Sequence, residues 1–263
     1  MTRAGYYAWR ARHARGHESA HTAQDRKLMV RIGALFTKHR GRYGSPRIQH
    51  DLQEAGVCVS RRRVARLMRT AGLQARAVRG YRGKAGVHRF YAACPNLLRR
   101  GAAPALDQVW VGDITYLVVA GRWRYLAVVM DQCSRRILAW TLTPRRDVRV
   151  TRAVLATALR RRRPSAGLIF HSDRGAEYLA RPLQAFLAAR GVRQSANAAG
   201  PGDNAHMESF FHSLKAEAIR GQHFATDAEL RATLTDYFTY YNRTRAHSAL
   251  GFRSPIDYER AAA

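Results

Sequence analysis

The segment Val109–Val119 constrains the fold of this chain more than any other segment. Apolar side chains occupy both alternating sets of positions in it, so a strand formed by these residues has two apolar faces. Strands of this kind are usually central in their sheet. Asp113 is the only charged residue in the segment. Because an unpaired carboxylate is costly to bury, Asp113 is either a satisfied structural residue or part of a functional site.

The residues after this segment predict an α/β fold. Further strands are expected at Tyr125–Met130, Ile137–Leu142, Leu168–Phe170 and Val192–Ser195, and helices at Val148–Arg160, Leu183–Ala189, Met207–Arg220 and Glu229–Tyr241. The first three strands suit an antiparallel meander. The order βββαβαβα matches a ribonuclease H-like core, in which a mixed five-stranded sheet packs against helices.

The front of the chain predicts a small helical domain with a helix-turn-helix-like segment at 46–72. Pro46 suits the start of a helix, and Gly56 suits its end. Ser60 is placed to cap a second helix, Arg61–Thr70. Two helices joined by a short turn that contains glycine have the outline of a helix-turn-helix motif.

Basic residues dominate the chain, and most of the excess lies in its front part. The formal net charge is +28, and residues 1–105 carry 23 basic and 4 acidic side chains. A charge of this size favours a polyanionic partner, nucleic acid first. The candidate DNA contacts on the second helix are Arg61, Arg62, Arg63 and Arg66. An arginine run binds phosphates more readily than it reads bases, so groove reading and phosphate contact both stay open.

We expect two domains, a basic helical DNA-binding region at 1–103 and an α/β domain at 104–263 with a helical C-terminal tail. Residues 75–103 have the composition of a linker, with weak periodicity and many glycines and arginines. His13, His17 and His21 recur every four residues, but no neighbouring cysteine or carboxylate completes a metal-ligand set. A solvated helix face is therefore the favoured interpretation of the three histidines.

Cysteine usage and hydropathy favour an intracellular protein. The three cysteines are far apart and form no CxxC pair, as is typical of a reducing compartment. No apolar run approaches the roughly 18 residues of a membrane span, and the first residues lack the apolar region of a signal peptide. We therefore expect a cytoplasmic protein.

Asp173 is the second candidate carboxylate. It follows the strand predicted at Leu168–Phe170, and strand ends are where α/β sheets place their chemistry. Taken alone, Asp173 is equally suited to a turn.

The helix predicted at Met207–Arg220 presents a third carboxylate. Glu208, His212 and Lys215 form a stripe beside the apolar stripe of this helix. A solvated face is the alternative, but only four of the 46 basic residues are lysine, which makes Lys215 informative. Carboxylates from a central strand, a neighbouring strand end and a helix would hold two Mg²⁺ ions, because hard cations prefer oxygen ligands. Two such ions activate the attacking oxygen and stabilise the leaving oxygen of a phosphodiester.

Three motifs carry a family resemblance: Trp110–Tyr116, His171–Gly175 and Asp203–Phe211. They resemble the OrfB transposases of bacterial insertion sequences, whose catalytic domain resembles retroviral integrase. The likeness continues in Gly5–Trp9, Tyr43–Ile48, Val64–Arg69, Tyr241–His247 and Ser248–Pro255, so it includes nearly the whole chain.

The resemblance implies that Asp113, Asp173 and Glu208 are the metal ligands of a DDE catalytic domain at 104–263, with Mg²⁺ or Mn²⁺ as the ion. It implies that Lys215 contacts the terminal DNA. The implied reaction is metal-dependent cleavage at the ends of the element, followed by attack of the freed 3′-hydroxyl on another phosphodiester. The implied partners are DNA at the element ends and the target, a homo-oligomer on DNA, and a DNA-binding product of an upstream reading frame.

The chain departs from the family pattern at three points. The interval between Asp173 and Glu208 holds 34 residues, one fewer than is usual. Glu177 stands where Gln is usual, and His206 stands where Pro is usual. These departures concern activity rather than fold.

Two competing carboxylates and two rival functions stay open. Asp131 ends the second strand beside Asp113, although a salt bridge to Arg135 or Arg136 is the plainer expectation, and Glu177 is near enough to Asp173 to approach the site. The rival functions are a ribonuclease H-like nuclease that hydrolyses without joining, and a DNA-binding protein that has lost catalysis. The intact set of carboxylates favours the transposase.

Overall fold

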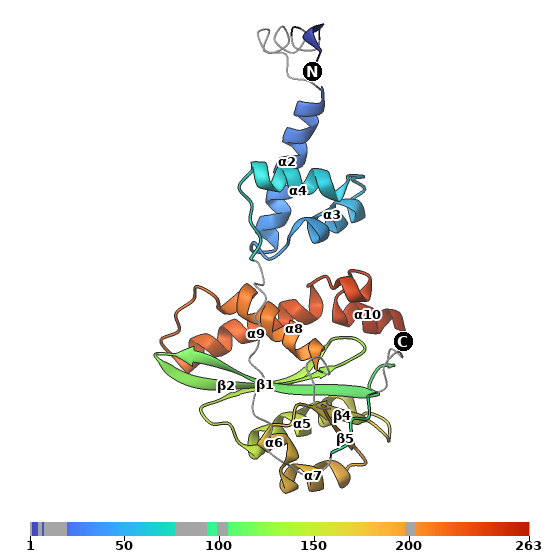
Figure 1. The fold of residues 1–263 in the computed structure, drawn as a ribbon, viewed down its shortest axis with the longest axis vertical. Helices are drawn as coiled ribbons and strands as arrows, with labels where there is room; N and C mark the ends of the chain where they lie inside the picture. The colour runs from blue at the N-terminus through green and yellow to red at the C-terminus, as the bar shows by residue number, and fades with distance from the viewer. Residues whose placement is uncertain are drawn as a thin grey trace. The chain divides into compact units, whose positions relative to one another are not determined.

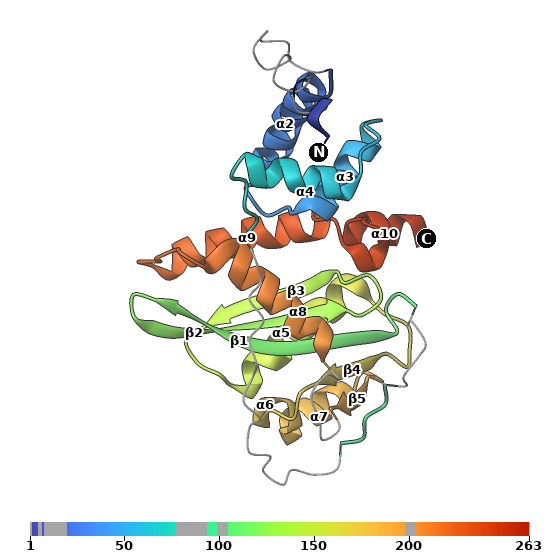
Figure 2. The same cartoon turned by 45° about the horizontal axis from the view of Figure 1, so that its top comes forward.

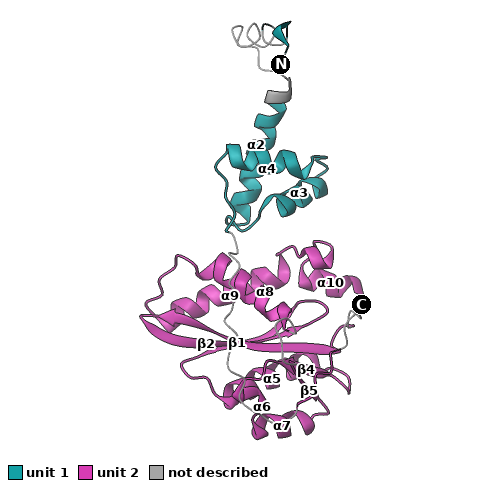
Figure 3. Ribbon diagram, in the orientation of Figure 1, with its two compact units in different colours: residues 1–77 teal, residues 78–263 magenta. Residues whose placement is uncertain are grey.

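The computed structural model describes residues 2–4, 7, 20–76, 94–98, 105–197 and 204–262. The chain forms two compact units, residues 1–77 and 78–263, which Figure 3 shows in different colours. The division falls inside the segment 75–103 that the sequence predicts to be a linker. The domain boundary expected near residue 103 stays a prediction. The histidine stripe at 13, 17 and 21 lies outside the residues whose side chains are described.

In the described part of the first unit, three helices pack together: α2 (Ala20–Lys38), α3 (Ser45–Glu54) and α4 (Arg61–Thr70). The start of α4 is as predicted, because the Ser60 hydroxyl accepts a hydrogen bond from the backbone N–H of Arg63 at 3.3 Å. The turn after α3 contains Gly56 at a φ of +74°, a conformation that favours glycine. The core of this unit is made of apolar side chains from the three helices: Leu28, Ile32, Ile48, Leu52, Val64, Leu67 and Met68.

The second unit is built on a five-stranded sheet, as Figure 1 shows. Its strands are β1 (Val109–Val119), β2 (Arg122–Asp131), β3 (Ile137–Thr143), β4 (Ile169–Ser172) and β5 (Arg193–Ala196). The strand order is β3-β2-β1-β4-β5. The pairs β1–β2 and β2–β3 are antiparallel, and the pairs β1–β4 and β4–β5 are parallel. The sheet is therefore mixed, and β1 is central, as the sequence predicts.

Helices cover both faces of the sheet (Figures 1 and 2). One face packs against α5 (Val148–Arg162), α6 (Ala176–Leu179) and α7 (Arg181–Ala188). The other packs against α8 (Ala205–Leu214), the turn η1 (Lys215–Ile219) and α9 (Asp227–Arg243). The chain then forms the short turn η2 (Ser248–Leu250) and the helix α10 (Pro255–Ala262), in agreement with the expected helical tail.

The helix expected at Met207–Arg220 has a different form in the structure. The α-helix runs from Ala205 to Leu214, but the turn from Lys215 to Ile219 is a π-helix. The backbone N–H of Arg220 donates to the carbonyl of Lys215 at 2.8 Å, which closes the wide turn. π-helical turns are rare and often occur at functional sites.

Part of the predicted linker packs on the sheet. The backbone N–H of Ala196 in β5 donates to the carbonyl of Pro95 at 3.1 Å, and the N–H of Leu97 donates to the hydroxyl of Ser195 at 2.9 Å. The described stretch 94–98 therefore belongs to the second unit. Among the described helices, none combines the length and the apolar character that crossing a membrane requires.

Candidate active site

Asp113 lies in the middle of β1 and faces the α8–α9 layer. Val111 and Leu117 belong to the core on that side of the sheet, and alternation places Asp113 on the same face. One carboxylate oxygen accepts the backbone N–H of Ile114 at 2.7 Å. The preceding residue must be glycine, because a Cβ on Gly112 would lie 2.5 Å from the ring of Phe170.

Asp173 reaches the same edge of the sheet from β4. The parallel register pairs Val111 with His171, so Asp113 and Asp173 each lie two residues beyond that pair. The carboxylate of Asp173 accepts the backbone N–H of Gly175 at 2.9 Å. The ring of the fully buried His171 contacts Ser195 and Asn197 at 2.8 and 2.7 Å, which fixes β4 against β5 just before Asp173.

Burial raises the pKa of both aspartates, and the charge of a nearby carboxylate adds to it, that of Asp173 at Asp113 and that of Glu177 at Asp173. Burial is the main cause at Asp113, and the charge of Asp173 adds to it, so that the pKa of Asp113 rises to about 8. Burial is also the main cause of the raised pKa of Asp173. The negative charge of the two aspartates is therefore not fully balanced by neighbouring cations, as is typical of a site that binds a metal ion.

Glu177 is a third carboxylate close to the aspartates, and it is paired with Arg146. The guanidinium of Arg146 lies 2.6 Å from a carboxylate oxygen of Glu177, whose side chain is 7% exposed. A Cβ on Gly175 would lie within 3.0 Å of Asp173 Oδ1, Arg146 Nη2 and Glu177 Oε1, so only glycine leaves room for the three charged groups. Arg146 lowers the pKa of Asp113, which is further evidence that this guanidinium belongs to the cluster.

Glu208 lies in the first turn of α8 and is exposed. The start of α8 is held beside the site by Asn204, whose side-chain amide donates to the carbonyl of Gly112 at 3.3 Å. Asn204 thus anchors the helix to β1 next to Asp113 and does not cap the helix with its own side chain. His206 is held neutral near Glu208, because burial and the charge of Arg135 lower its pKa to about 4.

Lys215 extends from the start of the π-turn toward β1. Its ammonium lies 4.7 Å from the centre of the Tyr116 ring. Burial lowers the pKa of Lys215, while the charge of Asp113 raises it. Lys215 is therefore near enough to the aspartate to interact with it, on the helix that carries Glu208.

The aspartate pair fits a hard divalent cation. Both side chains offer carboxylate oxygens, and both have a raised pKa that a cation would lower. In the part of the chain that the structure describes, no group of three or more His, Cys, Asp or Glu side chains is arranged to hold a metal ion. The structure thus brings Asp113 and Asp173 together, and Glu208 does not complete the set.

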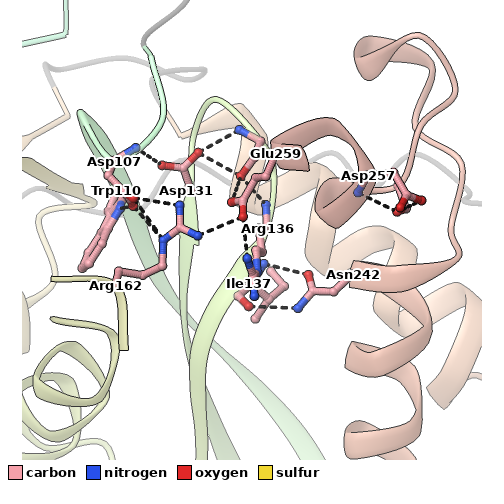
Figure 4. Close-up of polar contacts among 11 residues, drawn as sticks. Asp107, Trp110, Asp131, Arg136, Ile137, Arg162, Asn242, Asp257 and Glu259 are labelled. Carbon is pink, nitrogen blue, oxygen red and sulfur yellow. Dashed lines mark hydrogen bonds and ion pairs between the residues drawn. The ribbon is translucent and has the colours of Figure 1, made fainter. Parts of the chain in front are cut away.

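Asp131 and Glu217 have structural partners. Asp131 is fully buried and accepts a hydrogen bond from the backbone of Asp107, as Figure 4 shows. It also accepts hydrogen bonds from the backbone and hydroxyl of Ser134. The prediction of a salt bridge from Asp131 to Arg135 or Arg136 is wrong, because the neutral donors of Asp107 and Ser134 occupy the carboxylate oxygens of Asp131. Glu217 binds Arg245 at 2.7 Å on the side of η1 that faces α9.

The arginines of α4 divide into two groups. The guanidinium groups of Arg63 and Arg66 bind the carboxylate of Asp25 on α2 at 2.7 and 2.5 Å, which holds the two helices together. Arg61 and Arg62 are exposed. Arg61 and Arg62 are better placed to bind a phosphate than Arg63 and Arg66, because they do not take part in the ion pairs with Asp25.

Sequence reasoning missed the roles of Arg146 and Asn204. Arg146 contacts a residue 31 positions away, and Asn204 contacts one 92 positions away. Arginine is so frequent in this chain that nothing in the sequence distinguishes Arg146 from the other arginines. Asn204 did give one, since it lies four residues before Glu208 in the same motif.

Comparisons with known proteins match both units of the chain. Family models described as "Integrase core domain" match residues 103–201 and 208–262, and one described as "HTH-like domain" matches 23–81. The chain is 37% identical over 262 residues to transposase InsF for insertion sequence IS3A of Escherichia coli, covering 98% of this chain and 90% of that one. It is 38% identical over 238 residues to the transposase for insertion sequence element IS904 of Lactococcus lactis, covering 89% and 93%. A solved structure of the HTLV-2 integrase catalytic core domain aligns with a TM-score of 0.45 and 14% identity, covering 60% of this chain and 99% of that one.

Proposed function

We propose roles for individual residues from the premise that this chain belongs to the IS3 family of insertion-sequence transposases. As a transposase with an integrase core domain, it acts on DNA. We assign Asp113, Asp173 and Glu208 as the catalytic carboxylates that would hold Mg²⁺, or Mn²⁺ in its place, with Glu208 joining the aspartate pair only when the ion binds. The observation that carries the assignment is the buried, electrostatically coupled pair Asp113 and Asp173 at one edge of the sheet.

The bound ions would supply charge stabilisation for the attacking and leaving oxygens of a phosphodiester. The protein's own side chains bind the DNA end and orient it at the carboxylates. Lys215 holds a phosphate of the DNA end near the carboxylates, since its ammonium is a compact point charge. Asn204 fixes the start of α8 against β1, and Arg146 keeps Glu177 paired beside the aspartates. Glu177 then serves as a positioning residue, because its carboxylate is already committed to a guanidinium.

The reaction that we propose has two stages, cleavage at the ends of the element and joining of the freed 3′-hydroxyl to another phosphodiester. The helical unit binds DNA through Arg61 and Arg62, and Arg63 and Arg66 hold its helices together. Two ends must meet before joining, so we propose that the chain works as a homo-oligomer, together with DNA-binding residues from an upstream frame. The site of action is the bacterial cytoplasm, where the DNA is.

The test is a paired cleavage and strand-transfer assay on labelled DNA carrying the element ends. Asp113→Asn, Asp173→Asn and Glu208→Gln should each abolish both reactions and keep DNA binding nearly intact. Asp236→Asn is the control, because Asp236 is an exposed carboxylate on α9. Cleavage without any labelled donor in the target DNA would support the rival nuclease. Normal cleavage by one of the three variants would remove that residue from the site.

A further inference from the structure

Three large apolar side chains are exposed together on one face of the β1–β2 hairpin. Tyr116 and Trp123 are each 55% exposed, and Val118 between them is 45% exposed. The register pairs Val118 with Trp123 and Tyr116 with Tyr125, so these residues are neighbours on the same side of the two strands. A cluster of exposed apolar side chains on a charged protein commonly marks a contact surface.

The surface exists because the hairpin extends past the helices that cover this side of the sheet. Trp110 and Val129 lie on the same face nearer the other end of their strands, and there they are buried under α5 and α7. Figures 1 and 2 show the end of the hairpin projecting beyond α5 and α6. A fold that only needed to close its core would place polar side chains on this projecting face.

The two rings are arranged edge to face, and a cation touches one of them. The ring centres of Tyr116 and Trp123 are 5.0 Å apart with an angle of 89° between the planes. The Lys215 ammonium lies 4.7 Å from the centre of the Tyr116 ring. Lys215 comes from the helix layer on the opposite face. Its side chain reaches the ring along the edge of β1, where pairing with β4 ends at Val111.

A cross-strand aromatic pair stabilises a hairpin, but that role does not explain the ammonium. Tyr116 is three residues from Asp113 on the same strand, a span of about 10 Å. The charge of Asp113 also acts on Lys215. The aromatic pair and Asp113 lie on opposite faces of β1, and the Lys215 cation, which interacts with both, connects them over a distance short enough for the end of one DNA strand.

We propose that Tyr116 and Trp123 form a stacking platform for an unpaired nucleobase of the DNA strand whose phosphate Lys215 holds. The inference rests on the proposed function, and it adds a base-binding site to the phosphate and metal contacts. Aromatic faces bind any base by stacking, so the platform grips a frayed or single-stranded DNA end without reading its sequence. Holding the terminal base out of the duplex keeps the adjacent phosphodiester at the carboxylates.

The experiment compares a blunt DNA duplex with the same duplex carrying a short single-stranded overhang that contains 2-aminopurine. The fluorescence of this base falls when it stacks on another ring. All measurements are made on the full chain in EDTA, so that binding is separate from cleavage. The wild-type protein should quench the overhang and bind it about tenfold more tightly than the blunt duplex, within the range that one stacked base contributes.

The variant Tyr116→Ala/Trp123→Ala should lose both the quenching and the preference for the overhang, and its affinity for the blunt duplex should stay the same. Both side chains are more than half exposed, so their removal leaves the core intact. Val118→Ala is the matched control, since it removes exposed apolar surface from the same face without removing a ring. Tyr116→Phe should keep the quenching, because it keeps the ring.

Unchanged quenching in the double variant overturns the proposal. Loss of self-association without a change in quenching overturns it too, because the face would then be a contact between two copies of the chain. The proposed function fails separately, through absence of metal-dependent cleavage by the wild-type protein. Quenching in EDTA without that cleavage would keep the platform and refute the catalytic assignment.

Discussion

Single residues set the electrostatics of the site, and Asp113 is the clearest case. A carboxyl group held in a buried strand beside a second aspartate has a pKa of about 8, so in the metal-free protein it is largely protonated at neutral pH. A cation that binds here must displace this proton, and the attraction between the cation and the two carboxylates offsets the energy needed to ionise them. The protein thus maintains a carboxylate pair that is costly to ionise in the absence of a cation.

This arrangement predicts the pH dependence of stability in EDTA. The pKa of Asp113 is higher in the folded chain than the value of about 3.9 in an unfolded one. The folded state therefore binds the proton more tightly, and stability falls as pH rises through the folded pKa. His206 acts in the opposite direction, since its lowered pKa of about 4 makes stability rise up to its ordinary pKa near 6.5. Between roughly pH 6.5 and 8, the loss at Asp113 should dominate, at around 1 kcal/mol per pH unit.

Thermal unfolding of the wild type and of Asp113→Asn isolates this contribution. The amide does not titrate, so the variant should lose less stability over the same pH range, while Asp173 and Asp131 contribute alike to both proteins. Added Mg²⁺ should reduce the slope of the wild type, because a cation favours the charged carboxylate. Parallel stability curves for the two proteins would show that Asp113 is not the titrating group.

At the scale of elements, the π-turn connects the active site to the buried interior. The turn puts Glu217 toward α9, where it binds Arg245, and Tyr237 donates its hydroxyl to the same carboxylate at 3.1 Å. The side chains of Glu217 and Arg245 are only 3% and 7% exposed. Lys215 begins the same turn, so this buried pair helps to fix the direction of the lysine side chain.

Glu217→Ala should therefore destabilise the second unit by about 3–5 kcal/mol, because it leaves the Arg245 guanidinium buried without its partner. Chemical denaturation followed by tryptophan fluorescence measures the change. Glu217→Leu combined with Arg245→Leu should recover most of the loss, since apolar side chains need no partner there. A loss below 1 kcal/mol for the single variant would mean that water reaches Arg245 and replaces the carboxylate.

The tail helix α10 is attached through one carboxylate, which Figure 4 shows. Glu259 contacts the guanidinium groups of Arg136 and Arg162, and one of its carboxylate oxygens lies 2.9 Å from the Ser134 hydroxyl, whose single hydrogen it shares with Asp131. Glu259→Ala should release α10, and hydrogen exchange of 255–262 should then increase strongly. Arg260→Ala is the control on the same helix, because its side chain is 76% exposed. Equal exchange in the two variants would assign the attachment to apolar contacts.

The sequence predicts most helices and strands, but it predicts few of the side-chain contacts between them. The strands β1 to β5 and the helices α5, α7 and α9 follow from local periodicity, which a single sequence displays directly. The short helix α6 and the π-turn at Lys215 were not predicted, because four or five residues carry too little periodicity. The nearness of Asp113 and Asp173 follows from the predicted strands and the family resemblance, since Asp173 taken alone suits a turn equally well. The pairing of Arg146 with Glu177 was not found, since it depends on tertiary packing between distant segments.

At the scale of the whole molecule, we propose that one unit provides most of the DNA binding and that the other carries out DNA cleavage and joining. Most of the excess positive charge lies in the front part of the chain, and the carboxylate cluster lies in the second unit. Basic side chains that bind phosphates release counterions, so their contribution to binding depends strongly on salt. Basic side chains that pair with a carboxylate inside the unit contribute to its stability. The arginines of α4 include both kinds, and substitution can tell them apart.

Replacing the exposed Arg61 and Arg62 with Ala in the full chain should reduce the log–log salt slope of DNA binding by about 0.9 for each lost phosphate contact. Their loss should leave the melting temperature nearly unchanged.

Arg63→Ala with Arg66→Ala should do the reverse, lowering the melting temperature of the helical unit, because both guanidinium groups hold Asp25 of α2 against α4. The hydrogen bond from Arg66, together with that from Arg63, lowers the pKa of Asp25 against the effect of burial, so Asp25→Asn should reproduce the loss of stability. Fluorescence anisotropy across a salt series and thermal unfolding give the two readouts. A salt slope that stays the same without Arg61 and Arg62 would mean that this end of α4 does not face DNA.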